Sequence, residues 1–235
     1  VNSSTKLLTF SKPDIRKQKL YSLLSKYKIT YEEVNRILNG LKNIKIHIVG
    51  DTIVDTYINT TVIGAKAKTP TLSVKKLSEK SFLGGAAIVA THIEKAGAKV
   101  SFTSVIGNDT NGKWVKSKLN KSKITNNLII DNSRPTTNKI VYIADDYRML
   151  KVDELENFEI SKKNIQKISK KIKNLKVDGI IFSDFRHGIF NENTIKEFNK
   201  NIANGVFTVA DSQVASRWGN ITEFKSFDMI TPNEN

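Results

Sequence analysis

Two aspartates, Asp51 and Asp55, stand close together directly after the apolar run 44–49. A carboxylate at the end of a buried strand can accept charge-assisted hydrogen bonds from the hydroxyl groups of a ligand. About thirty residues further on, the glycine pair Gly84 and Gly85 opens a run of small residues typical of a helix start, where backbone amides can approach a polar group closely. Either aspartate alone could be a turn or capping residue, but the glycine pair favours a binding role for Asp55.

Later strands are also followed by polar residues. Asp184, Arg186 and His187 come after the apolar segment 179–183, and two further polar groups follow short strands, 211–213 and 231–234. The sequence leaves open whether His187 is structural or faces a ligand. Asp109 is predicted instead to cap the helix that follows it.

Searches for other catalytic patterns are negative. The three histidines, His47, His92 and His187, lack the spacing of metal ligands, so no metal site is expected from them. The chain has no Gly-x-Ser-x-Gly elbow and no Walker-type phosphate loop. The glycine pair lacks the Gly-x-Gly-x-x-Gly spacing of a nicotinamide-binding fold, which disfavours a dehydrogenase.

The candidate residues must be positioned by an alternation of short apolar strands and amphipathic helices that begins at Ile44. This pattern predicts an α/β fold with a mostly parallel sheet and helices on both faces, and ligands on such sheets bind at the carboxyl ends of the strands. The expected strands are 44–49, 99–106, 128–130, 179–183, 206–210 and 228–230. The expected helices are 85–96, 111–121, 161–175 and 192–204.

Two parts of the chain depart from this alternation. Segments 56–77 and 139–152 are β-rich and are predicted to form a small lid over the strand ends. Residues 1–43 are predicted to be a helical arm or linker, with helical periodicity in 15–24 and 31–41. Thr30 is the expected N-cap of the second helix, in a capping box with Glu33.

Composition limits the class of protein. The chain has 235 residues, 39% of them hydrophobic, and no cysteine, which excludes disulfides and thiolate chemistry. It contains no apolar run of about 18 residues, so we expect no membrane association and a cytoplasmic location. The net charge of +15 comes mainly from dispersed lysines. This distribution favours a solvated surface over a specific nucleic-acid site, and it suits anionic small substrates such as nucleotides or sugar phosphates.

Taken together, six motifs resemble those of the ribokinase-like (PfkB-type) carbohydrate kinases over residues 44–235. Within that family they look closest to the heptose-phosphate kinase domain of bifunctional ADP-heptose synthases. The resemblance implies a three-layer α/β fold with a mostly parallel central sheet, a small β lid and a missing C-terminal part. The motifs are Gly50–Asp55, Gly84–Ala90, Ala96–Ala98, Ile106–Gly112, Pro135–Lys139 and Thr231–Asn233.

The resemblance also implies roles for particular residues. Asp55 would bind sugar hydroxyls, the turn at Gly84 and Gly85 would line the sugar pocket, and Lys139 and Asp184 would lie near the substrate under the lid. Asp51, from the same motif as Asp55, is a further substrate-binding candidate. On the nucleotide side, Asn233 would help to organise ATP and Mg²⁺, and His187 stands where the heptose kinases tend to have a lysine.

Besides His187, the sequence departs from the family pattern in two places. Ile88 replaces an asparagine that usually contacts the sugar. The chain also stops at Asn235, before the Gly-x-Gly-Asp segment that supplies the catalytic base, so no catalytic residue is expected in this chain and it should be inactive alone. It is either a fragment of a longer kinase or a degenerate member. Residues 1–8 resemble a segment that closes nucleotidyltransferase domains, which implies a fusion.

These observations favour ATP-dependent phosphorylation of a sugar or sugar phosphate, with this chain carrying the substrate-binding half. A non-catalytic sugar-binding or regulatory module derived from the kinase fold is the alternative. Nucleic-acid binding through the net charge is a third hypothesis, and it predicts an affinity that falls steeply with salt. By resemblance, lid strands pair between subunits, so a homodimer through the lid is expected.

Overall fold

The computed structural model describes residues 15–64, 71–212 and 221–231. The chain divides into two units, Val1–Lys42 and Asn43–Asn235. In the described part of the first unit, helices α2 (Ile15–Lys26) and α3 (Tyr31–Leu41) follow one another. The predicted capping box is confirmed: the Glu33 amide donates to Thr30 Oγ1 over 3.1 Å, and the Thr30 amide donates to Glu33 Oε2 over 2.8 Å.

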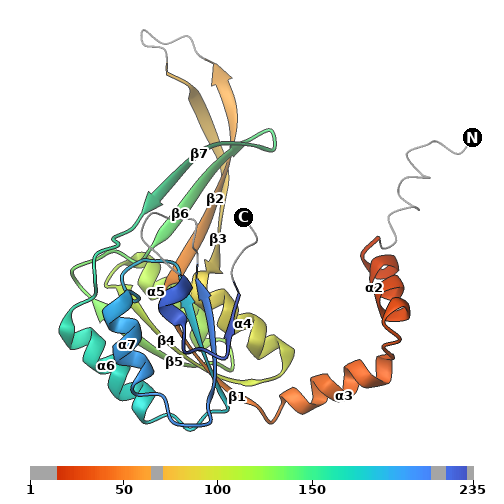
Figure 1. The fold of residues 1–235 in the computed structure, drawn as a ribbon. Coiled ribbons are helices and arrows are strands. Elements are labelled where there is room, and N and C mark those ends of the chain that lie inside the picture. Colours follow the sequence, from red (N-terminus) through yellow and green to blue (C-terminus); the bar gives the residue numbers. More distant parts are fainter. Residues whose placement is uncertain (1–14, 65–70, 213–220, 232–235) are drawn as a thin grey trace, which may run out of the picture. The chain divides into compact units, whose positions relative to one another are not determined.

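The second unit is built on a parallel sheet of six strands, in the order β10-β9-β8-β1-β4-β5 (Figure 1). Strand β1 lies between β4 and β8, so the residues at its carboxyl end lie at the middle of the sheet edge. The mostly parallel sheet predicted from the sequence is confirmed. Its strands are β1 (Lys45–Gly50), β4 (Lys99–Gly107), β5 (Thr125–Asp131), β8 (Gly179–Asp184), β9 (Phe207–Ser212) and β10 (Met229–Ile230).

Helices cover both faces of this sheet because consecutive strand residues point to opposite sides. Val49 and Phe182 pack with helices α6 (Lys162–Lys173) and α7 (Glu192–Asn199). Ile48 and Phe102 pack on the other side with α4 (Gly85–Ala96) and α5 (Thr110–Asn120). Burial of each such side chain contributes about 1.5–3 kcal/mol. The three layers expected for the fold are therefore present.

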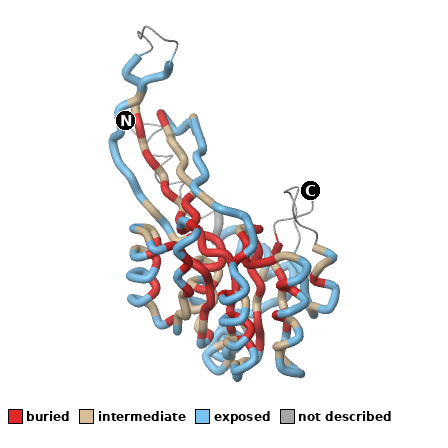
Figure 2. Tube along the Cα trace, turned by 90° about the vertical axis from the view of Figure 1, so that its left-hand side faces the viewer, coloured by how far each residue is buried: buried red, intermediate tan, exposed pale blue. Residues whose placement is uncertain are grey.

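A second sheet of four strands, the lid sheet, rises from the carboxyl ends of the first (Figure 1). Its strand order is β3-β2-β6-β7, and β2 pairs antiparallel with β3 but parallel with β6. Along β2, buried and half-buried residues alternate, as Figure 2 shows for the tube that rises from the core. The strands are β2 (Thr52–Gly64), β3 (Ser73–Gly84), β6 (Asn138–Ala144) and β7 (Tyr147–Glu154).

The lid strands are longer than predicted. The sequence indicated 56–77 and 139–152, but β2 begins at Thr52, directly after Asp51, and β3 continues to Gly84. Asp55 therefore does not follow a strand at a turn, as expected, but lies inside one. The difference arises because the polar residues of β2 pair with neighbouring lid strands, which local patterning does not reveal.

Of the other elements, α7 and β5 differ most from the predictions. Helix α7 ends at Asn199 and not at 204, and the turn that follows it contains Asn201, whose side-chain amide donates to the Glu197 carbonyl. Strand β5 extends over Thr125–Asp131 because its whole length pairs with β4. A short 3₁₀ helix, Ile221–Phe224, packs near α7. Among the described residues, no helix is long and apolar enough to span a bilayer.

Candidate substrate site under the lid

Asp51 joins the two sheets and is buried, with 3% of its surface exposed. Its Oδ2 accepts hydrogen bonds from the amides of Phe185, at 2.9 Å, and His187, at 3.2 Å. Burial, followed by the negative charge of Asp184, raises the pKa of Asp51 to about 7. Asp51 thus holds the loop that follows β8. It also lines a polar cavity with Thr52, Arg134, Pro135, Thr137, Glu156 and His187 among others.

Asp55 lies against the glycine pair, as the sequence predicted. A methyl group on Gly84 would overlap the Asp55 carboxylate, so only glycine leaves room for this side chain. Gly85 has a φ of +56°, and a methyl group there would overlap the carbonyl oxygen of Asp51. The Asp55 carboxyl is half-buried, and burial raises its pKa against the opposing charges of Lys139 and Lys151.

Lys139 faces Asp55 across the lid sheet, because the two residues are register partners on β6 and β2. Its Nζ lies 5.9 Å from the centre of the Phe185 ring, which brings the β8 loop and the lid together. Within the described ranges, Lys139 forms no ion pair with a carboxylate at 4.0 Å or less. Burial, followed by the charge of Lys151, lowers the pKa of Lys139. An ammonium in this state favours an anionic ligand.

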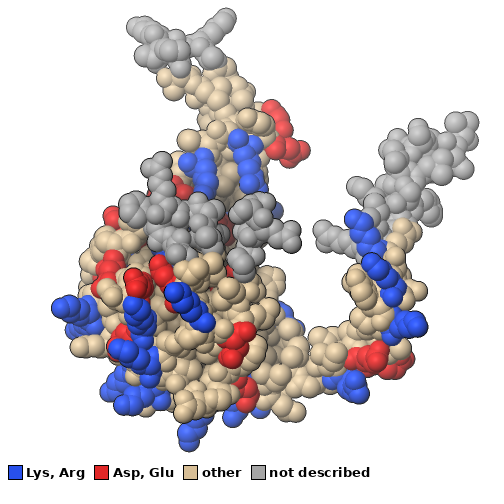
Figure 3. All heavy atoms as spheres, in the orientation of Figure 1, with Lys and Arg blue, Asp and Glu red and all other residues tan. Residues whose placement is uncertain are grey.

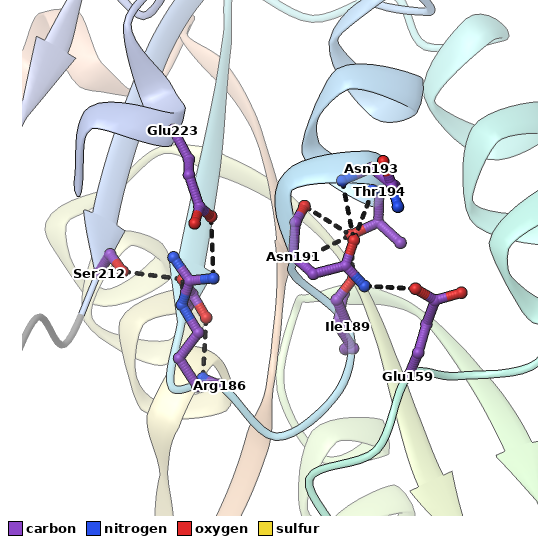
Figure 4. A network of polar contacts seen from close by, with 9 residues as sticks. Glu159, Arg186, Ile189, Asn191, Asn193, Thr194, Ser212 and Glu223 are labelled. Atoms are coloured by element: carbon purple, nitrogen blue, oxygen red, sulfur yellow. Dashed lines mark hydrogen bonds and ion pairs between the residues drawn. The ribbon is translucent and has the colours of Figure 1, made fainter. Parts of the chain in front are cut away.

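Asp184 is held by its own loop. Its Oδ1 accepts from the Arg186 amide, and its Oδ2 accepts from Ser212 Oγ and pairs with Arg186 Nε, each over 2.8 Å. Figure 4 shows Arg186 extended from this group toward Glu223, with which it forms a second ion pair of 2.9 Å. Burial raises the pKa of Asp184, and Arg186 opposes that shift. Both oxygens are engaged within the protein, and the contact with substrate stays a prediction.

The imidazole of His187 lies within electrostatic range of Lys139, Asp153 and Lys151, which are all lid residues. Both ring nitrogens are buried and have no hydrogen-bond partner in the part of the chain that the structure describes. Burial, followed by the charge of Lys139, lowers the pKa of His187 to about 4, so the ring is neutral at physiological pH. The structure thus groups His187 with the substrate candidates. Its role toward the nucleotide stays a prediction, and Asn233 lies outside the described residues.

Arg134 was not singled out from the sequence. Its guanidinium donates to the carbonyl oxygens of His187, over 2.9 Å, and Phe158, over 2.7 Å, and it lies 4.5 Å above the Phe158 ring. Arg134 therefore also fixes the loop after β8, to which Asp51 is bonded. A signal was present: the chain has few arginines, and this one directly precedes the Pro-Thr-Thr motif.

The cap predicted at Asp109 is confirmed and extended. Asp109 Oδ1 accepts from the Gly112 amide over 2.7 Å, which caps helix α5. Its Oδ2 accepts from the Thr136 amide over 2.6 Å. The Thr136 hydroxyl in turn accepts from the Gly107 amide over 2.9 Å. The cap thereby also ties the segment that leads into β6, and so Lys139, to the main sheet.

The described residues were also considered as metal ligands. No cluster of three or more histidine, aspartate or glutamate side chains suited to a metal occurs among them. By themselves, the described residues therefore do not provide a set of ligands for Mg²⁺.

A parallel sheet covered by helices on both faces, with a β lid above the carboxyl ends of its strands, is the architecture of ribokinase-like proteins. Solved structures support this fold. Ribokinase from Giardia lamblia matches with a TM-score of 0.60 at 16% identity, covering 82% of this chain and 62% of that one. Ribokinase from Arabidopsis thaliana complexed with ribose and ATP matches with a TM-score of 0.56 at 16% identity, covering 81% and 60%.

Sequence comparison gives the family. The model of the pfkB family of carbohydrate kinases matches residues 43–235, and the chain belongs to this family. Bifunctional protein HldE of Helicobacter pylori (strain J99) is 36% identical over 152 residues, which are 62% of this chain and 32% of that protein. Bifunctional protein HldE of Aliarcobacter butzleri is 33% identical over 203 residues, 82% of this chain and 40% of that protein. The chain thus spans between about a third and two fifths of these curated relatives.

Proposed function

We propose that this chain is the substrate-binding half of a kinase that transfers the γ-phosphoryl group of ATP to a hydroxyl of a sugar or sugar phosphate, with a heptose phosphate as the model substrate. The observation that carries the proposal is the meeting of Asp55, Gly84 and Lys139 under the lid. Family membership and the similarity to two HldE proteins support it.

Each of these residues has a defined part in the proposed site. Asp55 accepts hydrogen bonds from sugar hydroxyls and so orients the ring. Gly84 leaves the space that the Asp55 carboxylate and the sugar share. Lys139 supplies positive charge beside them. In the reaction, a substrate hydroxyl oxygen attacks the γ-phosphorus, ADP leaves, and the hydroxyl proton passes to a base. ATP supplies the phosphoryl group when bound, and Asn233 is proposed to help hold it.

The test uses the complete protein that contains this chain. Transfer from radiolabelled ATP is measured over a panel of free sugars and sugar monophosphates, and binding of the same compounds is measured by calorimetry. Phosphorylation of at least one sugar compound, lost without Mg²⁺, is the expected result. Sugar binding without any transfer would instead establish the non-catalytic module, and binding of none of the compounds would refute a sugar site altogether.

We also propose that the protein forms a homodimer through the lid sheet. The lid face opposite Asp55 and Lys139 carries an apolar row, and two of its members, Leu150 and Val152, are 57% and 37% exposed. The outer strands β3 and β7 each have one edge without a partner in the described sheet. Exposed apolar faces and free strand edges of this kind are suited to pairing with a second copy.

A further inference from the structure

One face of the lid sheet carries four charged side chains. Asp55, Lys139 and Asp153 stand opposite one another across strands β2, β6 and β7. Lys151 lies two residues before Asp153 on β7. Residues that face each other across a sheet share a side, as do alternate residues along a strand, so all four point the same way.

The two lysines on this face, Lys139 and Lys151, differ in burial and in their contacts. Lys151 Nζ lies 3.1 Å from Asp153 Oδ2, and the two side chains are 53% and 36% exposed. Lys139 is half-buried and contacts the Phe185 ring without a carboxylate partner among the described residues. Burial, followed by the charge of Lys151, lowers the pKa of Lys139, and the carboxylates of Asp153, Asp55 and Asp51 oppose this shift. Two ammonium groups on one face of the sheet repel one another, and a ligand with two negative charges would relieve the repulsion.

The imidazole of His187 is a neutral hydrogen-bond donor near these four side chains. His187 is in the loop that follows β8, next but one to Phe185, whose ring Lys139 contacts, and after burial the charges of Lys139, Asp153 and Lys151 also act on its imidazole. Neither ring nitrogen has a hydrogen-bond partner within the described ranges. An uncharged imidazole can donate one hydrogen bond to a phosphate oxygen without competing for the negative charge.

We propose that Lys151, together with Lys139, binds the phosphate group of a sugar-phosphate substrate, and that Asp153 holds the Lys151 ammonium until the phosphate replaces it. The proposal rests on the proposed function and specifies its substrate class. Asp55 stands at the other end of the row and takes the sugar hydroxyls. Two strand spacings separate Asp55 from Asp153, about 10 Å, comparable with the length of a sugar ring that carries a phosphate.

The experiment compares substrates with and without a phosphate. Aldose and ketose monophosphates, each beside its free sugar, are titrated calorimetrically into the complete protein and assayed for phosphoryl transfer. Lys151→Gln should weaken binding of the monophosphates by about 10- to 100-fold, the value of a hydrogen bond between charged groups, and change free-sugar binding by less than about 2-fold. Lys75→Gln, an exposed lysine of β3 away from the row, is the matched control and should change neither.

A second variant tests the role of Asp153. Asp153→Asn frees the Lys151 ammonium, so the monophosphates should bind with equal or higher affinity. If Asp153 contacted the sugar itself, the same change would weaken binding of monophosphates and free sugars alike, and this would overturn the proposal. An equal effect of Lys151→Gln on both substrate classes would also overturn it, as would no effect on either.

These outcomes differ from failure of the proposed function. A protein that phosphorylates free sugars, and is unaffected by Lys151→Gln, remains a sugar kinase but lacks this phosphate subsite. A protein that binds monophosphates through Lys151 but transfers no phosphoryl group keeps the subsite and loses the kinase function. Since Lys151 is more than half exposed, its substitution should not unfold the chain, which a thermal melt verifies.

Discussion

Asp51 and Asp55 lie four residues apart, yet their carboxylates are in different environments. Asp51 is buried and its Oδ2 accepts two amide hydrogen bonds from the β8 loop. Asp55 is half-buried on the lid and accepts no such bonds from backbone amides of the described residues. The first is suited to fixing the loop and the second to binding a ligand.

Removing the charge of Asp55 should weaken substrate binding. We expect Asp55→Asn to lower kcat/KM of the complete protein by about 10- to 100-fold, because a charge-assisted hydrogen bond to a sugar hydroxyl becomes a neutral one. Steady-state kinetics on the best sugar compound measure this. The control is Asp145→Asn in the β6–β7 turn, which is exposed and should leave the rate unchanged. Equal rates for Asp55→Asn and the wild type would exclude a contact between Asp55 and the substrate.

Asp51 should make stability depend on pH. Its folded-state pKa of about 7 lies above the usual value near 3.8, so the folded protein binds this proton more tightly than the unfolded chain. The resulting stabilisation is complete below about pH 4 and is lost as the pH rises through 7. Asp51→Asn keeps an oxygen for the two amides but cannot ionise.

Thermal unfolding from pH 5 to pH 8 measures this effect. The melting temperature of Asp51→Asn relative to the wild type should rise by several degrees over this range, at about 2–4 °C per kcal/mol. Asp146 is exposed in the lid turn, so the melting temperature of Asp146→Asn should change with pH as that of the wild type does. A constant difference between Asp51→Asn and the wild type would show that Asp51 is already ionised at pH 5.

At the scale of elements, the turn from β3 into α4 contains one glycine needed for stability, Gly85, and one expected to affect sugar binding, Gly84. Ala at Gly85 requires a positive φ and meets a backbone carbonyl, which costs about 1–3 kcal/mol. Ala at Gly84 meets only the movable Asp55 carboxylate. We expect Gly85→Ala to lower the melting temperature by about 5 °C or more, and Gly84→Ala to lower it less but to weaken sugar binding.

Calorimetry and thermal melts of the two variants separate these effects. Gly40→Ala in α3, where a methyl group has open space, should be neutral or slightly stabilising. If Gly84→Ala bound sugars normally, Asp55 would not be held in place by the absence of a side chain at that position.

Local chemistry was enough to predict most elements. The capping box at Thr30, the cap at Asp109 and the helix 85–96 all depend on residues within a few positions of each other, and the structure confirms them. The lid strands were predicted too short, since their polar residues are stabilised by partners far along the chain.

The same limit applies to the site. The sequence placed Asp51, Asp184 and His187 at the correct edge of the sheet, but it could not show that the first two are engaged by loop amides and by Arg186. The importance of Arg134 depends on carbonyl groups 24 and 53 residues away. Lys151 was missed because its place beside Lys139 follows from strand register alone.

At the scale of the whole molecule, charge and apolar surface are distributed differently. Figure 3 shows lysine and arginine side chains interspersed with acidic ones over the α6 and α7 side, and groups of both signs on the lid. This mixed surface gives no single basic patch on the face shown. Exposed apolar side chains, among them Leu150 and Val152, lie instead on the lid.

The proposed dimer should depend on this apolar lid face. We expect Leu150→Lys to convert the dimer to a monomer, because it places a charge in the surface that the two lids would bury. Burial of each apolar side chain there would stabilise the dimer by about 1.5–3 kcal/mol. Light scattering coupled to gel filtration measures the mass. Ile130→Lys, at a similarly exposed position on β5, is the control and should remain dimeric. A wild-type monomer at micromolar concentration would disprove the lid dimer.

The junction at Asp51 has a mechanical consequence. Since β1 ends at Gly50 and β2 begins at Thr52, the lid is attached to the central sheet without a slack connection. A tilt of the lid would turn the backbone of Asp51. The carboxylate of Asp51 accepts hydrogen bonds from the amides of Phe185 and His187 in the loop after β8. A movement of the lid would therefore be transmitted through Asp51 to the loop after β8, so the two could not shift independently.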